Sequence, residues 1–402
     1  MVLKSEIEKA FQFQYQKLNL HKQEVFRDKI AHLESNTSMV EVISGIRRCG
    51  KSTLLRHQMK KYKKIAYINF EDPRLFNFEL SDFTKLDEII PANTEAYFFD
   101  EIQNVEKWEV YVRQLHDEGK KVYITGSNAS LLSKELGTRL TGRYLNTELF
   151  PFSYEEFLRF EKKDANLQSM QKYLKEGGFP EYLKTKNSEI LQILFKDIIL
   201  RDIAVRYGVR NPRALVDIAL FLLSNVGKES SFTSIKKTFQ LGSVQTVIDY
   251  VNWMEDAYLL FFVHRFSWSA KSVAINPKKV YAIDNGLIDA NTLSFSEDHG
   301  RKLENAVFLF LRNQGKKIYY FREKQECDFV IFEKNKCRHA IQVCLELNTD
   351  NQKRELNGLL EAVNYFELAS GTIVTLNQKD QLTVEGKTVY LVPAHEFFLV
   401  NN

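Results

Sequence analysis

Residues 45–52 read GIRRCGKS and fit the pattern G-x-x-x-x-G-K-[ST] at every position. The apolar run MVEVIS precedes this stretch and predicts a strand, and TLLRHQMKKY follows it and predicts a helix. A glycine-rich loop between a strand and a helix presents backbone amides and the helix dipole to an anion. The sequence therefore predicts a phosphate-binding loop. Its expected residues are Gly45, Ile46, Arg47, Arg48, Cys49, Gly50, Lys51, Ser52 and Thr53.

Four side chains have expected tasks at this loop and after a later strand. Lys51 would reach the β- and γ-phosphate oxygens of ATP or GTP, and Ser52 would ligate Mg²⁺. The apolar run AYFF ends in Asp100 and Glu101. We expect Asp100 to hold the metal ion through water and Glu101 to polarise the attacking water.

Polar residues further along the chain complete the predicted site. The apolar run VYIT leads into Thr125, Ser127 and Asn128, and we expect Asn128 to contact the γ-phosphate or the attacking water. A transferred phosphoryl group carries dispersed charge, so such sites often recruit an arginine from a neighbouring subunit. Arg143 is the first candidate for that role, and Arg139 is the second.

The pattern of apolar runs predicts an α/β protein. Five short runs alternate with helical stretches between residues 39 and 149, which is typical of a parallel sheet with βα crossovers. Helical periodicity then dominates to about residue 270, and a second α/β pattern follows residue 300. The expected parts are an N-terminal helical segment (1–35, with a helix over 6–33), a P-loop domain (36–150), a helical lid with a winged helix (151–285) and a C-terminal domain (286–402).

Composition excludes several classes of protein. A net charge of +4, from 56 Lys and Arg against 52 Asp and Glu, limits any nucleic-acid contact to a local patch. Four cysteines without a C-x-x-C pair favour a reducing compartment. The sequence has no run of eighteen apolar residues and no N-terminal signal pattern. We therefore expect a cytoplasmic protein that is neither secreted nor membrane-spanning.

Residues 232–268 have the pattern of a winged helix. FTSIKKTFQ and VQTVIDYVNWMEDA predict two helices around a turn, and LLFFVHRFSW predicts a strand pair. The second helix would be the recognition helix, but it carries Asp249, Glu255 and Asp256 and neither lysine nor arginine. Acidic side chains are unfavourable beside phosphates. Two interpretations stay open, a module that contacts DNA and one used for packing or subunit contacts.

Short motifs along nearly the whole chain resemble those of prokaryotic AAA-type ATPases with a C-terminal restriction-endonuclease-like domain. They are SGIRRCGKSTLL, YINFEDPRL, FFDEIQNVEKWE, ITGSNASLL, LTGRY, LFPFSYEEFL, GGFPEYL, LRDIA, VYAIDNGL and LENAVFLFLRNQG. The resemblance implies an ATPase core, a helical lid with a winged helix, and a terminal nuclease-like fold. It also implies that Asn69, Glu71 and Asp72 line the nucleotide site.

The nuclease-like fold implied by the resemblance has its own expected site. A metal-dependent nuclease of this fold needs a helix glutamate, an aspartate on the next hairpin and a Glu-x-Lys on the following strand. Glu304 and Asp328 stand at the first two places, but Gln342 and Cys344 replace the second glutamate and the lysine. A lost carboxylate weakens the binding of hard cations, and a thiol cannot replace an ammonium group. We therefore expect no DNA cleavage, with Glu304 and Asp328 kept as structural or binding residues.

The expected function is that of a Mg²⁺-dependent ATPase with ATP and Mg²⁺ as ligands. Its hydrolysis cycle would move the winged-helix and nuclease-like modules in a homo-oligomer, with DNA as one candidate partner. Two alternatives stay open, an ATP-gated DNA nuclease and a nucleotide-dependent switch or scaffold with little turnover.

Overall fold

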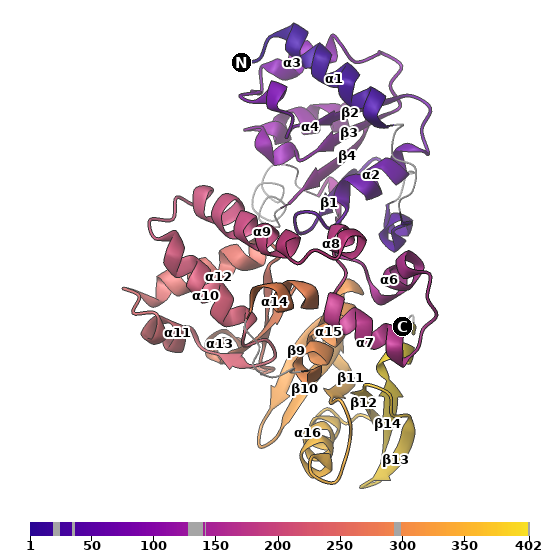
Figure 1. The fold of residues 1–402 in the computed structure, drawn as a ribbon, viewed down its shortest axis with the longest axis vertical. Helices are drawn as coiled ribbons and strands as arrows, with labels where there is room; N and C mark the ends of the chain where they lie inside the picture. The colour runs from indigo at the N-terminus through magenta and orange to yellow at the C-terminus, as the bar shows by residue number, and fades with distance from the viewer. Residues whose placement is uncertain (19–24, 34–36, 128–139, 141, 293–298, 401–402) are drawn as a thin grey trace. The chain divides into compact units, whose positions relative to one another are not determined.

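The structure of the chain is a computed structural model that divides into two compact units, Met1–Phe150 and Pro151–Asn402. Figure 1 follows both units from the indigo N-terminus to the yellow C-terminus. The described residues are 1–18, 25–33, 37–127, 140, 142–292 and 299–400. Within these ranges, no helix combines the length and the apolar character that crossing a bilayer requires.

The first unit is built on a parallel sheet. Its strands are β1 (Val40–Ser44), β2 (Ile65–Asn69), β3 (Ala96–Asp100), β4 (Lys121–Gly126) and β5 (Tyr144–Glu148). They lie in the order β2-β3-β4-β1-β5, and each neighbouring pair is parallel. The predicted parallel α/β sheet is therefore confirmed. Because parallel strands end at the same edge, the residues that follow β1, β3 and β4 come together there.

Helices cover both faces of this sheet (Figure 1). They are α1 (Lys4–Leu18), α2 (Lys51–Met59), α3 (Asp82–Asp87) and α4 (Trp108–Asp117). Side chains alternate along each strand, and Val42, Ile68 and Phe99 join the core on the face covered by α1, α3 and α4. Tyr123 lies on the opposite face, where Gln58 of α2 donates a hydrogen bond to its hydroxyl (2.8 Å).

The N-terminal segment is helical over only part of the predicted length. Helix α1 buries Ile7 and Phe11 in the core of the first unit. A short 3₁₀ helix, η1 (Asp28–His32), follows later, and Arg27 before it has an extended backbone (φ −92°, ψ 126°). The prediction of one helix over residues 6–33 is therefore wrong. Because the backbone of Arg27 is extended and not helical, the chain cannot continue as one helix here. The Arg27 side chain reaches the loop after β1 and donates to the carbonyl oxygen of Cys49.

The second unit begins with a helical region. Its helices are α6 (Tyr154–Glu161), α7 (Leu167–Glu176), α8 (Pro180–Thr185), α9 (Glu189–Asp197) and α10 (Pro212–Leu223). Helix α9 continues directly into a π-helix, η5 (Ile198–Val205). The helix-rich region predicted from the sequence is confirmed.

Two motifs of this unit meet at one buried carboxylate. Asp284 accepts hydrogen bonds from the backbone N–H groups of Gly178 (2.6 Å) and Leu287 (3.0 Å). Gly177 has a φ of +70°, and a Cβ there would lie 2.2 Å from Asp284 Oδ1. The segments GGFPEYL and VYAIDNGL therefore pack against each other through Asp284. Only glycine at position 177 admits so close an approach.

A small module with three strands follows α10. In chain order its elements are β6 (Glu229–Ser230), α11 (Phe232–Thr238), α12 (Val244–Asp256), β7 (Leu260–His264), α13 (Ala270–Ile275) and β8 (Lys278–Ala282). The strands are antiparallel in the order β6-β8-β7, and we call this part the β6-β8-β7 module. The strand pair predicted within residues 259–268 is wrong, because β7 pairs with β8 beyond α13 and not with its own continuation.

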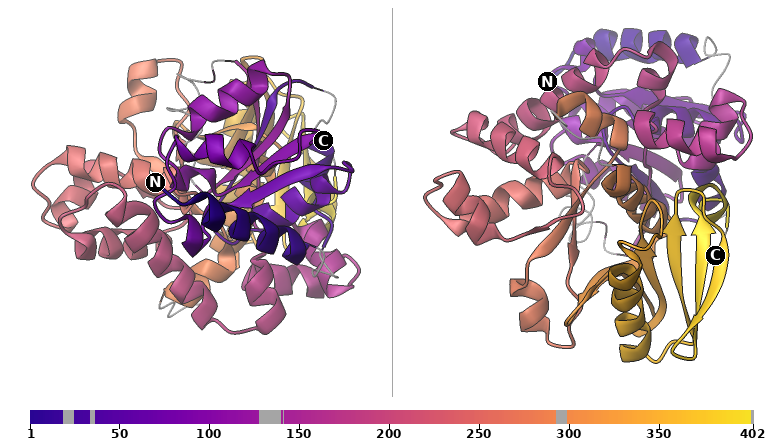
Figure 2. Two further views of the ribbon diagram at one scale, coloured as in Figure 1. Left: turned by 90° about the horizontal axis from the view of Figure 1, so that it is seen from above. Right: turned by 60° about the horizontal axis from the view of Figure 1, so that its bottom comes forward.

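The last part of the second unit is a mixed sheet with helices. Its elements are α14 (Asn285–Asn291), α15 (His299–Asn313), β9 (Lys317–Arg322), β10 (Glu326–Glu333), β11 (Lys336–Val343), α16 (Gln352–Tyr365), β12 (Ser370–Thr375), β13 (Asp380–Val384), β14 (Lys387–Pro393) and α17 (Ala394–Phe397). The sheet order is β13-β14-β12-β11-β10-β9. In the right-hand view of Figure 2, β12, β13 and β14 form the yellow edge of this sheet. Helix α16 buries Leu359 and Val363 against it. The predicted second α/β part is confirmed.

Candidate active site

The loop after β1 has a backbone that only glycine allows at two places. Gly45 follows β1, and a Cβ there would lie 2.0 Å from the carbonyl oxygen of Leu149. Gly50 has a φ of +104°, and a Cβ there would lie 2.8 Å from Arg27 Nη1. Helix α2 begins at the next residue, Lys51. The glycines therefore let the loop curl tightly before the helix N-terminus, which is the geometry that receives phosphate groups.

Lys51 points into the loop and is almost fully buried, with 3% of its side chain exposed. Its ammonium donates to the carbonyl oxygens of Gly45 (3.1 Å) and Ile46 (3.2 Å) and lies 3.4 Å from Glu101 Oε1. Burial by itself would lower the pKa of Lys51, but the nearby Glu101 carboxylate holds it above its usual range. Lys51 is therefore a buried cation between the loop and the end of β3.

Asp100 is fully buried at the end of β3 and accepts several hydrogen bonds. The Thr125 hydroxyl donates to Oδ1, and the Tyr67 hydroxyl donates to Oδ2 (3.2 Å). The Ser52 side chain is also hydrogen-bonded to this carboxyl group. Burial, and after it the charge of Glu101, raises the pKa of Asp100. The Ser52 hydroxyl and the Asp100 carboxylate, which are predicted to bind the same metal ion, are therefore in direct contact.

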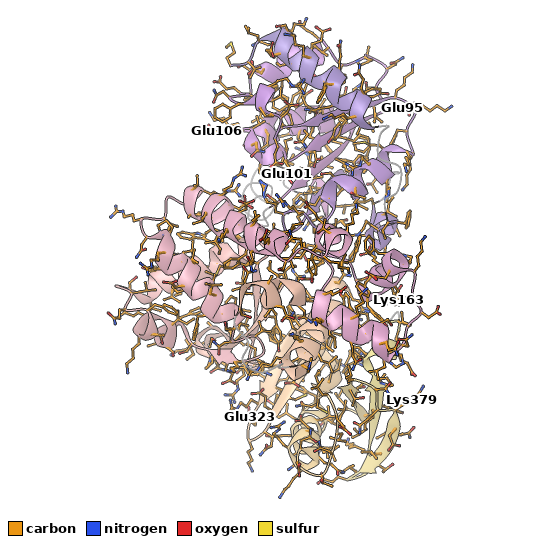
Figure 3. The ribbon with its side chains drawn as sticks, in the orientation of Figure 1. Glu95, Glu101, Glu106, Lys163, Glu323 and Lys379 are labelled. Carbon is orange, nitrogen blue, oxygen red and sulfur yellow. The ribbon has the colours of Figure 1, made fainter. Side chains whose placement is uncertain are left out.

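Glu101 has a left-handed backbone (φ 52°), which turns its side chain toward Lys51. Gln103 donates to Glu101 Oε2 and also to the hydroxyl of Ser127 (3.3 Å), while the backbone N–H of Glu101 donates to Thr125 Oγ1 (2.9 Å). Burial alone would raise the pKa of Glu101, but Lys51, Gln103 and Arg47 together lower it. Figure 3 labels Glu101 at the carboxyl end of β3.

The segment after β2 contributes one residue to the site. Arg47 of the loop donates through both terminal nitrogens to Glu71 Oε1 (3.0 and 2.7 Å). Asp72 instead pairs with Arg74 (2.6 Å) and accepts a hydrogen bond from Gln14 of α1 (3.0 Å), and these bonds lower its pKa to about 2. Glu71 is therefore part of the site, whereas Asp72 fastens α1 to the sheet.

The remaining loop residues differ in exposure. Ile46 and Cys49 are fully buried, and the Cys49 thiol donates to the carbonyl oxygen of Leu149 (3.4 Å). Arg48 is exposed and has a left-handed backbone (φ 63°), and Thr53 is half-buried in the first turn of α2. The side chains of Ile46 and Cys49 are thus packed inside the protein.

The structure does not bring Arg143 to the loop of its own chain. Arg143 directly precedes β5, and its carbonyl oxygen accepts from the N–H of Val40 (2.9 Å) at the start of β1. Its guanidinium lies 3.7 Å from Asp117. The phosphate-binding loop follows the other end of β1, about 13 Å away at ~3.3 Å per residue. Asn128 and the alternative Arg139 lie outside the described residues.

Sequence reasoning missed Arg27. It is 2% exposed, and its guanidinium donates to the carbonyl oxygens of Cys49 (2.5 Å) and Phe150 (2.6 Å). It thereby ties the phosphate-binding loop to the last residue of the first unit. No motif marks it, because its partners are backbone atoms 22 and 123 residues away.

The first unit has the fold of a P-loop ATPase domain of the AAA type. The sheet order, the glycine loop after β1, the acidic pair after β3 and the polar residues after β4 define that class. Family comparison agrees, since residues 37–158 match the AAA domain family. Residues 167–298 and 299–397 match two domains of unknown function, DUF8612 and DUF4143. The latter match assigns no nuclease, so the restriction-endonuclease-like fold stays a prediction.

Two relatives match most of the chain. The uncharacterized protein MJ1544 of Methanocaldococcus jannaschii is 36% identical over 380 residues, which are 87% of this chain and 85% of the relative. An uncharacterized protein of Haemophilus influenzae is 31% identical over 386 residues, covering 89% and 94%. The chain belongs to the protein family of these two relatives. AMPPCP-bound DnaA from Aquifex aeolicus aligns over 61% of this chain and 88% of its own with 14% identity, but its TM-score of 0.27 is too low to support any conclusion.

Proposed function

We propose that the protein is a Mg²⁺-dependent ATPase whose hydrolysis cycle moves the second unit. The observation that carries the proposal is the buried Lys51–Glu101 pair, held inside a glycine loop at the carboxyl edge of a parallel sheet. A buried cation beside open backbone amides attracts the γ-phosphate of a nucleotide, and a carboxylate beside it can accept a proton from water.

The residues divide the work of hydrolysis between them. Lys51 exchanges its bonds to the loop carbonyls for bonds to phosphate oxygens, which stabilises the charge of the transferred group. Glu101 then loses its ammonium neighbour and accepts a proton from the attacking water. Gln103 and Thr125 fix the orientation of Glu101 through the side chain and the backbone. Burial alone would raise the pKa of Glu101, but Lys51 lowers it before nucleotide binds, so Glu101 is ionised when the nucleotide arrives.

Ser52 and Asp100 are the residues proposed to hold Mg²⁺. They fit the ion, because a hydroxyl and a carboxylate oxygen are the hard ligands it prefers and the two side chains are already hydrogen-bonded to each other. When bound with the nucleotide, Mg²⁺ supplies positive charge to the β- and γ-phosphate oxygens. Thr125 and Tyr67 keep Asp100 in place by donating to its two oxygens.

Arg143 is proposed to act on the nucleotide of a neighbouring subunit. Its position at the amino edge of the sheet keeps it from its own loop, while its side chain is about one-third exposed. Arg143 lies at the amino edge of the sheet, opposite the phosphate-binding loop. It can reach the nucleotide of a second copy when that copy places the carboxyl edge of its own sheet beside this amino edge. This proposal requires a homo-oligomer. Asn128 is proposed to contact the γ-phosphate.

The second unit is proposed to contain a winged helix and a restriction-endonuclease-like domain, with DNA as the candidate partner. The order helix, strand, two helices and two strands from α10 to β8, with the short helix α13 between the last two strands, supports the winged helix. Glu255 of α12 accepts a hydrogen bond from the N–H of Phe262 (3.1 Å), and the Tyr207 hydroxyl donates to Asp256 (3.4 Å). Asp249 accepts a hydrogen bond from Gln245 (2.8 Å), so all three acids have partners within the unit, which weakens the charge argument against DNA.

The proposed domain division keeps residues 1–35, 36–150, 151–285 and 286–402. The separation of the two compact units after Phe150 supports the second border. We also propose that the protein acts in the cytoplasm, since all four cysteines are free.

The proposed ATPase is tested by measuring ATP binding and phosphate release with the full-length protein and Mg²⁺. Lys51→Ala is expected to reduce both to background, because the buried cation is lost. Lys60→Ala, an exposed lysine at the end of α2, is the matched control and should keep wild-type values. A wild-type protein that neither binds nor hydrolyses ATP would contradict the proposal.

A further inference from the structure

Two carboxylates of the predicted nuclease site converge on a buried lysine. Lys279 of β8 has 2% of its side chain exposed, and its ammonium lies 3.1 Å from Glu304 Oε1 and 2.8 Å from Asp328 Oδ1. Glu326 is a third partner, at 2.7 Å. Glu304 belongs to α15 and Asp328 to β10, so one ammonium joins side chains from three separate elements.

Both carboxylates make further hydrogen bonds within the protein. The Tyr281 hydroxyl donates to the same Glu304 Oε1 (2.7 Å), and the N–H of Val343 donates to the other oxygen of Asp328, Oδ2 (2.9 Å). Gln342 accepts from the N–H of Asp328 (3.2 Å) with its oxygen and donates to Glu355 (2.7 Å) with its nitrogen. Gln342 therefore links the backbone of Asp328 to the side chain of Glu355. An ionised carboxylate at position 342 could not make both bonds, because it has no hydrogen to donate to Glu355.

A divalent metal ion does not fit this arrangement. The nuclease reading requires Glu304 and Asp328 to share a metal, yet the Lys279 ammonium lies within hydrogen-bonding distance of both. A second cation there would be repelled by a charge at about 3 Å in a buried environment. The backbone of Gly227 also lies close to Glu304, since a Cβ added there would lie 2.9 Å from Glu304 Oε2.

We propose that the Lys279 ammonium is a built-in cation that takes the place of a divalent metal between Glu304 and Asp328. The predicted nuclease site thereby becomes a joint that fixes the β6-β8-β7 module to the C-terminal sheet. Burial opposes the charge on Lys279, but the surrounding carboxylates, Asp328 first, hold its pKa well above the usual range. The ammonium is therefore a permanent part of the fold.

Further hydrogen bonds cross the same boundary and support a rigid joint. The N–H of Phe266 donates to the carbonyl oxygen of Tyr320 (2.8 Å), and the Tyr320 hydroxyl donates to that of Pro277 (2.7 Å). The N–H of Ala282 donates to Asn305 Oδ1 (2.8 Å). In the ATPase cycle, on which this consequence rests, the β6-β8-β7 module and the C-terminal sheet move as one body.

Lys279→Met in the full-length protein tests the charge balance of the joint. Removing the ammonium leaves buried carboxylates without a counter-ion, and we expect the unfolding midpoint of the second unit to fall by about 10 °C. Lys278→Met, the neighbouring lysine whose ammonium lies over the Phe232 ring, is the matched control and should cost less than about 3 °C. The triple variant Lys279→Met/Glu304→Gln/Asp328→Asn should regain at least half of the loss, because neutral amides replace the two more buried of the three carboxylates. Equal unfolding midpoints for the two lysine variants would overturn the proposed joint. A triple variant whose midpoint is no higher than that of Lys279→Met would overturn it as well.

Manganese binding to the wild-type protein gives a second test that does not depend on a destabilised variant. Without nucleotide, titration calorimetry with Mn²⁺ alone should give the same number of bound ions for wild type and Asp328→Asn, since Lys279 already occupies the site. One fewer bound ion in Asp328→Asn would show that Asp328 holds a metal and would overturn the built-in cation. This result is independent of ATP hydrolysis, so it separates failure of the joint from failure of the ATPase.

Discussion

The Lys51 ammonium lies 3.4 Å from Glu101 Oε1, and both side chains are buried at the carboxyl edge of the first sheet. Each residue shifts the pKa of the other toward its charged form, Lys51 upward and Glu101 downward. The pair thus keeps a cation for phosphate and a carboxylate for water ionised inside the protein. Nucleotide binding would separate the two by drawing Lys51 toward the phosphates.

Arg27 should stabilise the loop through its bonds to two backbone carbonyl oxygens. Arg27→Met leaves the carbonyl oxygens of Cys49 and Phe150 without this donor, and we expect a loss of about 2–4 kcal/mol in the stability of the first unit and weaker ATP binding. Urea unfolding and nucleotide titration measure both effects. Arg113→Met on the exposed side of α4 is the control. Unchanged stability in Arg27→Met would refute the role.

Gly45 should tolerate no side chain. A methyl group there would lie 2.0 Å from the carbonyl oxygen of Leu149, so Gly45→Ala must displace either the loop or the end of β5. We expect ATP binding to disappear and the first unit to lose about 2 kcal/mol or more. Gly242→Ala, where a methyl group meets open space, should leave both unchanged. Wild-type ATP affinity in Gly45→Ala would contradict the loop geometry.

Sequence patterns predicted the elements of the site better than its connections. The strand and helix periods around residues 45–52 and the acidic pair after AYFF were enough to predict the sheet, Lys51, Asp100 and Glu101. Arg27 and Lys279 escaped prediction because their partners lie far away in sequence, and burial of a lone basic residue leaves no periodic signal. The hydrogen bond from the N–H of Phe262 to Glu255 spans only seven residues, but it joins the end of a helix to the next strand and leaves no periodic signal either.

Glu255 should make the second unit more stable in mild acid. Burial raises its pKa to about 7, whereas the unfolded chain titrates near 4.5. Between these values the unfolded state releases the proton while the folded state keeps it, so stability falls as pH rises from about 4.5 to 7. Glu255→Gln should therefore be more stable than wild type at pH 8 by about 1–3 kcal/mol, and by less at pH 5.

Urea unfolding at pH 5 and pH 8 measures this difference. Asp249→Asn on the same helix is the control, since its carboxylate bonds only the neighbouring turn through Gln245 (2.8 Å), and it should change stability by less than about 0.5 kcal/mol. A Glu255→Gln protein less stable than wild type at pH 8 would rule out the buried, protonated state.

Arg143 should act between subunits. Arg143→Ala is expected to bind ATP normally but to lose about 10³-fold in turnover. Mixing it with Lys51→Ala should restore part of the activity, because an intact loop of one subunit then meets an intact Arg143 of the other. Phosphate release from the mixture, compared with each variant alone, measures this complementation. Activity no greater than the sum of the two variants would exclude an arginine shared between subunits.

Glu101→Gln tests most directly that this site hydrolyses ATP. The account predicts nucleotide affinity within about threefold of wild type and phosphate release about 10²–10⁴-fold slower, because the loop and Lys51 remain while the base is lost. Glu106→Gln, an exposed glutamate five residues further along, should match wild type in both. Wild-type phosphate release by Glu101→Gln would contradict the assignment of this site as the place of hydrolysis.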